Sequence, residues 1–183
     1  MKRIFLALTL LLGLCTWSLP MVHAQDTDAK PAKKAKKQKK KSGLSPVAQV
    51  LYDAGYFTET EALPKAKVYI FICSASWCGP CRMLMPKIVE EYEKNMKKNK
   101  SVSLVLLCAD STEEDAQKYI EHYKTSMPGV MNSKAHLENR PEIPGIPWCF
   151  FMNAKGELLH VGAGSDVLNW KEHMKAKPEK KKK

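Results

Sequence analysis

The sequence predicts an α/β domain with a mixed central β-sheet flanked by helices on both faces. A continuous apolar run at 68–73 and a largely apolar stretch at 102–108 are typical of strands that are buried on both faces. Helical signals follow each run, and a hairpin signal comes near the end of the chain. Strands that alternate with helices indicate parallel pairing through right-handed crossovers, and the hairpin adds antiparallel pairing.

The first predicted helix covers residues 46–54. Ser45 suits its N-cap, Pro46 suits the first helical position, and Gly55 follows its end. The longest helix is predicted from about 79 to 98 and begins soon after the first apolar run. Helices on either side of the strands are expected to form two layers around the sheet.

A third helix is predicted from Thr112 to about Tyr123. Thr112 is a favourable N-cap, and Glu113, Glu114 and Asp115 lie where the positive end of the helix dipole favours acidic residues. Beyond this helix the chain loses its hydrophobic periodicity until Trp148.

The end of the domain is predicted to be a hairpin followed by a helix. Strands at 148–152 and 157–161 flank the turn sequence Asn153-Ala154-Lys155-Gly156. Ser165 is expected to cap a last helix that ends near Met174. These elements place one domain at residues 44–175, the usual size for a single core.

Residues 1–24 are typical of a secretory signal peptide. Lys2 and Arg3 precede an apolar run from Ile4 to Leu14, and a more polar stretch ends at Ala24. The apolar run is well short of the roughly 20 residues that a membrane-spanning helix needs, so a retained anchor is the weaker interpretation. The protein is therefore expected to be exported, to the periplasm or another compartment outside the cytoplasm, with membrane association open.

Lysine-rich segments flank the domain at 25–43 and 176–183. Both lack hydrophobic periodicity and are expected to be a disordered linker and a disordered tail. Residues 43–170 contain 13 Lys and Arg against 15 Asp and Glu, so the basic charge lies in the tails. The tails could bind an anionic envelope surface or serve as soluble spacers. No aromatic residue lies between the lysines, so nucleic acid is not the expected partner.

The candidate reactive groups are Cys78 and Cys81, in Trp77-Cys78-Gly79-Pro80-Cys81. The two-residue spacing brings both sulfurs into the first turn of the predicted helix, where free N–H groups and the helix dipole stabilise a thiolate. Cys78 is expected to attack a substrate disulfide, and Cys81 to resolve the mixed disulfide. Half of a zinc knuckle and an inert structural disulfide are the alternatives, but neither explains the flanking residues.

No cofactor or metal is expected. The histidines are scattered, and no second closely spaced Cys or His pair completes a structural zinc site. Without Cys15 in the signal segment five cysteines remain, an odd number that cannot all pair within one chain.

The segment around Cys78 and Cys81 resembles the thioredoxin active-site signature without a substitution. Pro86 stands where thioredoxins carry the proline within the active-site helix, and Gly145-Ile146-Pro147 resembles their cis-proline loop. The similarity covers roughly residues 68–170. It implies a thioredoxin-like fold and a thiol-disulfide oxidoreductase.

The resemblance also implies roles for individual residues. Trp77, Gly79, Pro80 and Pro86 would support the active site. The Ile146–Pro147 bond would be cis, and its loop would offer backbone hydrogen bonds to an extended substrate. Trp148, which follows Ile146 and Pro147, would either line the substrate groove or belong to the core.

The sequence departs from the thioredoxin pattern in two places. Ile72 stands where thioredoxins place a buried Asp beneath the active site, and Leu106 takes the position of its Lys partner. The segment 127–143 is additional, and it is expected to be either a lid or substrate-selecting rim, or a surface loop without function. His136 within it is a weak candidate for a catalytic base.

The remaining cysteines, Cys73, Cys108 and Cys149, fall on predicted strands that would be adjacent in the sheet. Buried cysteine usually behaves as a small apolar residue, which is the favoured interpretation here. An auxiliary disulfide or redox relay that involves Cys149 is the alternative.

Two functions remain open. The first is an enzyme that exchanges disulfides in exported proteins, more readily as a reductase because Gly-Pro separates the cysteines, with a membrane protein as its redox partner. The second is a noncatalytic binding or scaffold module that lysine tails hold on an anionic envelope. The intact cysteine pair favours the enzyme, because a binding module has no need of both sulfurs.

Overall fold

The computed structural model describes residues 43–175. The predicted signal peptide, nearly all of the lysine-rich linker and the C-terminal tail lie outside the described residues. The described elements are α1 (Pro46–Ala54), β1 (Val68–Ser74), α2 (Gly79–Glu91), the π-helical turn η1 (Tyr92–Met96), β2 (Val102–Cys108), α3 (Glu113–His122), β3 (Gly129–Met131), β4 (Trp148–Asn153), β5 (Leu158–Ala163), the 3-10 helix η2 (Gly164–Asn169) and α4 (Trp170–His173).

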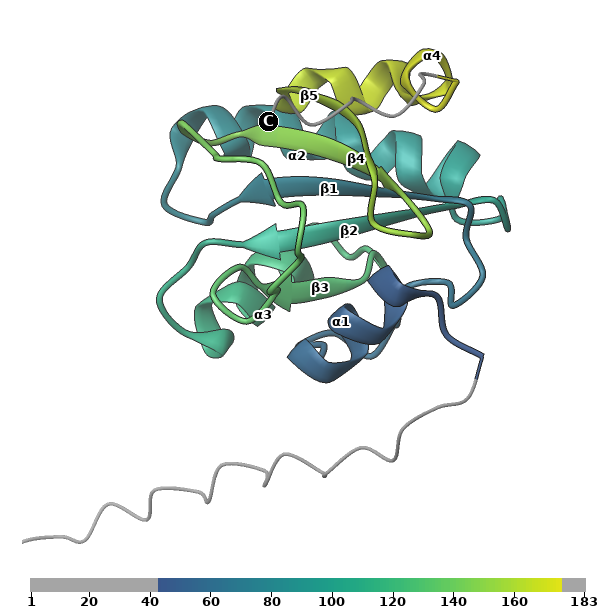
Figure 1. Cartoon of the computed structure of the whole chain (residues 1–183). Coiled ribbons are helices and arrows are strands. Elements are labelled where there is room, and N and C mark those ends of the chain that lie inside the picture. Colours follow the sequence, from purple (N-terminus) through teal and green to yellow (C-terminus); the bar gives the residue numbers. More distant parts are fainter. Residues whose placement is uncertain (1–42, 176–183) are drawn as a thin grey trace, which may run out of the picture. The chain divides into compact units, whose positions relative to one another are not determined.

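Five strands form one mixed sheet in the order β3-β2-β1-β4-β5 (Figure 1). The pairs β1–β2 and β2–β3 are parallel, whereas β1–β4 and β4–β5 are antiparallel. β1 lies at the centre of the sheet, and all seven of its residues are buried. The predicted mixed sheet, with the two apolar runs as its central strands, is confirmed.

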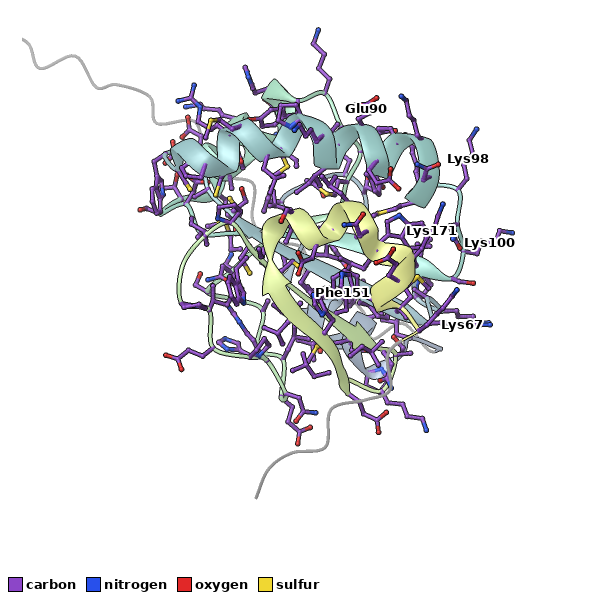
Figure 2. The ribbon with its side chains drawn as sticks, turned by 90° about the horizontal axis from the view of Figure 1, so that it is seen from above. Lys67, Glu90, Lys98, Lys100, Phe151 and Lys171 are labelled. Carbon is purple, nitrogen blue, oxygen red and sulfur yellow. The ribbon has the colours of Figure 1, made fainter. Side chains whose placement is uncertain are left out.

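Helices cover both faces of the sheet, as the sequence predicts. On one face Ile70 and Ile72 of β1 pack with residues of α2, α3 and the C-terminal helical segment. Phe151 of β4 lies in this cluster beneath that segment, as Figure 2 shows. On the other face Tyr69 and Phe71 pack with α1 and with residues from the segment between β3 and β4.

Strand β3 is absent from the sequence prediction, which treats 127–143 as one irregular segment. Three residues are too short to carry a periodic signal. Two backbone hydrogen bonds join this segment to β2. The N–H of Leu106 donates to the carbonyl of Pro128, and the N–H of Asn132 donates to the carbonyl of Cys108. At Gly129 an added Cβ would lie 2.4 Å from the Phe57 ring, so a larger residue there would displace that ring.

Helix α2 runs through Pro86, and the helical path continues as η1 to Met96, two residues short of the predicted end at Lys98. Pro86 has no N–H to donate to the carbonyl of Arg82, one turn earlier. The hydroxyl of Tyr123, at the end of α3, donates to that carbonyl oxygen at 3.4 Å. A side chain from another helix therefore supplies the hydrogen bond that proline removes.

The caps at Ser45 and Thr112 are confirmed, since each side chain accepts an N–H of its own first turn. The predicted cap at Ser165 is wrong, because the helical segment begins one residue earlier as η2, with Ala163 in the cap position. The first N–H of η2, from Gly164, donates to the carbonyl of Pro147 instead of to a side-chain cap.

The predicted hairpin between β4 and β5 is confirmed. The side chain of Asn153 accepts the N–H groups of Lys155 and Glu157, and Gly156 adopts a positive φ of 86°. Within residues 43–175, the helices are all too short or too polar to cross a membrane.

Candidate active site

Cys78 is the N-cap residue of α2, directly beyond the carboxyl end of β1. Its Sγ accepts the N–H of Cys81 at 3.4 Å. The first turn of the helix is therefore directed at this sulfur. In the chain Trp77 precedes Cys78, and Gly79 and Pro80 follow it as the first two residues of the helix.

Cys81 lies one turn further into α2 and is buried, with 1% of its surface exposed. Burial, and next the hydrogen bond with Cys78, raise the pKa of the Cys81 thiol to about 11, whereas the Ser74 hydroxyl and the backbone of Ala75 lower it. The two cysteines thus have different surroundings. Cys78 faces the loop that carries Ile146, and Cys81 faces the protein interior.

The Ile146–Pro147 peptide bond is cis, as expected from the resemblance. The carbonyl oxygen of Ile146 accepts the Cys78 thiol at 3.5 Å. Behind the loop, the carbonyl of Pro147 accepts the N–H of Gly164 at 3.1 Å. The loop is therefore bonded to the reactive sulfur on one side and to η2 on the other.

Trp77 and Met83 are the large apolar side chains that the domain exposes most, at 67% and 74%. Trp148 differs: it is partly buried, pairs with Cys73 across the β1–β4 ladder and packs against the core on the α1 side. Its ring therefore packs against the core, and a role in the substrate groove stays a prediction.

A pocket of about 430 Å³ is lined by Trp77, which precedes Cys78, and by Ile146 of the cis-proline loop. Trp77 and Ile146 form one part of it, and Asn132, Arg140 and Ile143 come from the segment that the sequence marks as additional. This segment therefore shares a pocket with Trp77 and Ile146, the residues next to Cys78 and to the cis-proline. His136, the weak candidate base in the same segment, lines a different pocket next to α1.

Arg140 is the charged residue of this pocket. Its guanidinium donates to the carbonyls of Asn132 and Ala135 and to the side chain of Asn132. Its Nε–H and one Nη2–H have no acceptor among residues 43–175. No acidic side chain of the described residues lines the pocket, so the pocket is positively charged.

The Thioredoxin-like family matches residues 66–158, just over half of the chain. The chain belongs to the thioredoxin-like family. Human nucleoredoxin is 28% identical over 122 residues, which cover 66% of this chain and 28% of nucleoredoxin. Sporulation thiol-disulfide oxidoreductase A of Bacillus subtilis is 29% identical over 90 residues, covering 49% of this chain and 54% of that protein. The thioredoxin of Wuchereria bancrofti superposes with a TM-score of 0.51 at 28% identity, covering 58% of this chain and 74% of that one.

The chain spans about a quarter to a half of the length of the two curated relatives. The family match on this chain runs through β1 and α2 and therefore includes Cys78 and Cys81. A relative in this family is named for thiol-disulfide exchange.

The buried acid that the thioredoxin pattern places beneath the active site is replaced by apolar residues here. Ile72 pairs directly with Leu106 across β1 and β2, and both side chains are fully buried. Polar groups near Cys81 come from another place: the hydroxyls of Ser74 and Tyr119 lie 2.8 Å apart in the interior, and the Ser74 hydroxyl lowers the pKa of Cys81.

Asp110 is a residue of the site that the sequence analysis misses. It is 7% exposed, and its carboxylate accepts the N–H and the hydroxyl of Ser76 and the thiol of Cys108. It thereby fixes the loop that leads into Cys78. The available signal is its position just beyond the carboxyl end of a buried strand, next to the end of β1.

The three remaining cysteines lie on adjacent strands, as predicted, and all are free and buried. Burial raises the pKa of the Cys73 and Cys149 thiols to about 12 in each case. Cys73 faces the α1 side of the sheet, whereas Cys108 and Cys149 face the α2 side. No disulfide joins them within the described residues.

Proposed function

We propose that this protein is a thiol-disulfide oxidoreductase that works through Cys78 and Cys81 and acts as a reductase on exported proteins. The observation that carries the proposal is the asymmetric pair itself. Cys78 caps the helix, accepts the N–H of Cys81 and is 7% exposed, while Cys81 is 1% exposed and has a raised pKa. An inert disulfide or a zinc ligand pair requires no such difference between its two sulfurs.

In the first step the Cys78 thiolate attacks one sulfur of a substrate disulfide. A bond forms between Cys78 and that sulfur, the substrate disulfide breaks, and the departing thiolate takes a proton. The loop at Ile146 and Pro147 lies against the reactive sulfur and is suited to hold an extended substrate segment through its backbone.

In the second step Cys81 loses its proton and attacks Cys78. A Cys78–Cys81 disulfide forms, and the second substrate sulfur leaves and is protonated, so the substrate gains two electrons and two protons. Because the buried Ile72 takes the position that carries a carboxylate in the thioredoxin pattern, the proton needs another path. The Ser74 and Tyr119 hydroxyls provide one, since Tyr119 also borders a surface pocket between α2 and α3.

The substrate side chain beside the attacked cysteine is proposed to enter the pocket next to Trp77. Its lining combines apolar walls, from Ile143 and Ile146 among others, with the free donors of Arg140. An acidic side chain or a carboxylate matches such a pocket. Substrates with an acidic residue near the disulfide are therefore expected to react best.

Export, a membrane redox partner and contact of the lysine tails with an anionic surface remain proposals. Turnover needs a donor of two electrons that reduces the Cys78–Cys81 disulfide, and a membrane thiol protein fits that role. Lys67, Lys98 and Lys100 point outward from one end of the domain in Figure 2. Lys67 also bonds through its N–H to Ser101, at the start of β2. Basic charge at the end of the sheet opposite the cysteine pair is compatible with docking to an anionic surface that leaves the active site accessible.

The reduction potential of the cysteine pair tests the proposed direction. Equilibration with a dithiothreitol or glutathione series, with a Cys78→Ser control, should give a reduction potential of about −270 mV for a reductase. A reduction potential of about −120 mV would make the protein a disulfide donor. If no reversible couple formed at this pair, a noncatalytic binding module held by its tails would replace the enzyme.

A further inference from the structure

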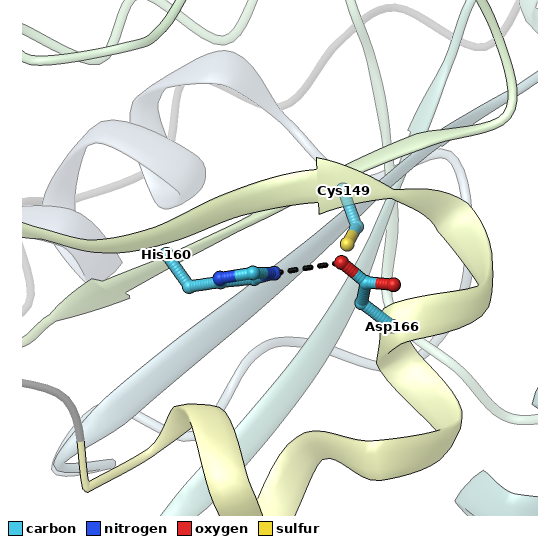
Figure 3. A group of neighbouring side chains, drawn as sticks. All are labelled: Cys149, His160 and Asp166. Carbon is cyan, nitrogen blue, oxygen red and sulfur yellow. Dashed lines mark hydrogen bonds and ion pairs between the residues drawn. The ribbon is translucent and has the colours of Figure 1, made fainter.

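Three side chains with metal-ligating atoms converge where β4, β5 and η2 meet (Figure 3). Cys149 comes from β4, His160 from β5 and Asp166 from η2. One ligand atom from each residue lies within 4.8 Å of the other two. Their spacing along the chain matches no metal motif, so only the fold brings them together.

The backbone of β5 leaves room for this cluster. Gly162 is the direct partner of Cys149 in the β4–β5 ladder. A Cβ at Gly162 would lie 2.1 Å from the Oδ2 of Asp166 and 2.9 Å from the Nε2 of His160. Any side chain at this position would therefore occupy the space in which the imidazole and the carboxylate meet.

The cluster is open to solvent on one side. Cys149 is buried, whereas the side chains of His160 and Asp166 are 22% and 30% exposed. The His160 Nε2 lies 2.8 Å from the Asp166 Oδ2, and the Cys149 thiol donates to the carbonyl of Ala163 at 3.0 Å. An ion can reach the buried sulfur past the two exposed ligands.

We propose that Cys149, His160 and Asp166 form a binding site for one Zn²⁺ ion, with water in the fourth position. A sulfur, an imidazole nitrogen and a carboxylate oxygen are the three donor types that zinc prefers, whereas magnesium and calcium select oxygen donors. Tetrahedral zinc places its ligand atoms roughly 3.3 to 3.8 Å apart. The three atoms reach this geometry through small side-chain rotations, in which the His160–Asp166 contact opens and the sulfur moves inward.

Binding changes protonation and involves no oxidation. The Cys149 thiol releases its proton to solvent, and neutral His160 keeps its proton on Nδ1 so that the Nε2 lone pair faces the ion. The His173 ring stacks on His160 with 3.7 Å between ring centroids, and the Phe151 ring meets His160 edge-on at 5.3 Å. These two rings hold the imidazole in the plane that directs its Nε2 toward Asp166.

The ion would join three elements that support the active site. η2 carries Asp166 and also donates the Gly164 N–H to the carbonyl of Pro147. β4 begins at Trp148, directly after the cis-proline. Zinc at this site would therefore fix η2 to β4 and β5 and raise the thermal stability of the domain.

Cobalt substitution tests the site in the full chain with Cys15, Cys78 and Cys81 replaced by serine. These replacements remove the reactive pair, which can itself bind zinc, so the outcome does not depend on the proposed redox function. Titration with Co²⁺ alone should give one thiolate-to-cobalt charge-transfer band per chain, and equimolar Zn²⁺ should displace it. Zn²⁺ alone should also raise the melting temperature.

Variants assign the ligands. Cys149→Ser and Gly162→Ala should abolish the band, and His160→Gln and Asp166→Asn should weaken Co²⁺ binding at least tenfold. Cys108→Ser, which removes another buried thiol from the same face of the sheet, should leave the band unchanged. If Cys149→Ser does not fold, the His160 and Asp166 variants decide, because both side chains are partly exposed. Absence of the band in the parent chain, or its persistence in the His160 and Asp166 variants, would overturn the proposal.

Discussion

The hydroxyl oxygen of Ser74 lies 2.8 Å from that of Tyr119, in a buried pair beside the resolving cysteine. Ser74 ends β1 and Tyr119 lies on α3, so the pair links the centre of the sheet to a surface helix. The position beneath the active site that carries an acid in the thioredoxin pattern holds Ile72 here. Two neutral hydroxyls thus take the place of a charged group near Cys81.

Ser74→Ala should slow the second step of exchange. The Ser74 hydroxyl lowers the pKa of Cys81 against the larger effect of burial, so its loss raises that pKa and leaves less thiolate at any given pH. A hydrogen bond to a charged group contributes about 1.5–3 kcal/mol, so resolution should slow about tenfold near neutral pH, and the rate profile should move to higher pH. Single-turnover reduction of an aromatic disulfide, with the mixed disulfide followed over time, measures this step.

Tyr119→Phe is the matched control, because it keeps the ring and removes only the hydroxyl. This variant should slow resolution less than Ser74→Ala does, since the Tyr119 hydroxyl acts on Cys81 only through Ser74. An unchanged rate for Ser74→Ala at every pH would exclude the hydroxyl pair from the proton path.

Alkylation should distinguish the two active-site thiols. At pH 7 iodoacetamide should modify Cys78 before Cys81, because Cys78 is 7% exposed against 1% for Cys81 and burial raises the pKa of Cys81 to about 11. In a Cys78→Ser chain, the thiols of residues 43–175 should react slowly and gain reactivity only as the pH rises toward 11. Peptide mass mapping of the alkylated chain identifies the site, and rapid labelling of Cys81 at pH 7 would contradict this asymmetry.

The hydrogen bond from Tyr123 to the carbonyl of Arg82 should stabilise α2 only because Pro86 is present. Tyr123→Phe is expected to lower the free energy of unfolding by about 0.5–1 kcal/mol, the lower part of the range for one hydrogen bond. In a Pro86→Ala background the same change should cost almost nothing, because the N–H of the introduced alanine can then bond to that carbonyl. Urea unfolding of the four chains gives the coupling, and equal losses in both backgrounds would show that Tyr123 acts through packing alone.

Arg140→Gln should reduce the preference for acidic substrates. For a disulfide peptide with Glu beside its cysteine, kcat/KM should fall roughly fivefold, in line with about 1 kcal/mol for a partly exposed ion pair. A matched peptide with Gln should change less than about twofold. Because Arg140 also holds the Asn132 and Ala135 carbonyls, equal losses for both peptides would assign it a structural role only. Arg82→Gln, which borders another pocket, is the charge control.

The sequence predicts most of the sheet and the position of the reactive pair because those features are local. The apolar runs of β1 and β2, the caps at Ser45 and Thr112 and the turn at Asn153 each have a signal within a few residues. Cys78 and Cys81 lie at the boundary between β1 and α2, so their place in the fold follows from the same signals.

Features that depend on contacts between distant segments are not visible in the sequence. β3 exists because β2 offers an open parallel edge and because Gly129 makes room for Phe57. Asp110 reaches Ser76 across the ends of two strands, and Cys149 meets Asp166 only after the hairpin and η2 have folded back. None of these pairs has a spacing that identifies it in advance.

The short strand β3 also determines how one border of the sheet meets its surroundings. On its outer side Tyr56 forms an antiparallel bridge to Val130, and the N–H of Phe57 donates to the carbonyl of Gly129. An open strand at this position would be a template for pairing with other chains. The residues after α1 occupy that template from within the same molecule, so the β3 border is protected against edge-to-edge aggregation and is a poor site for strand exchange between copies.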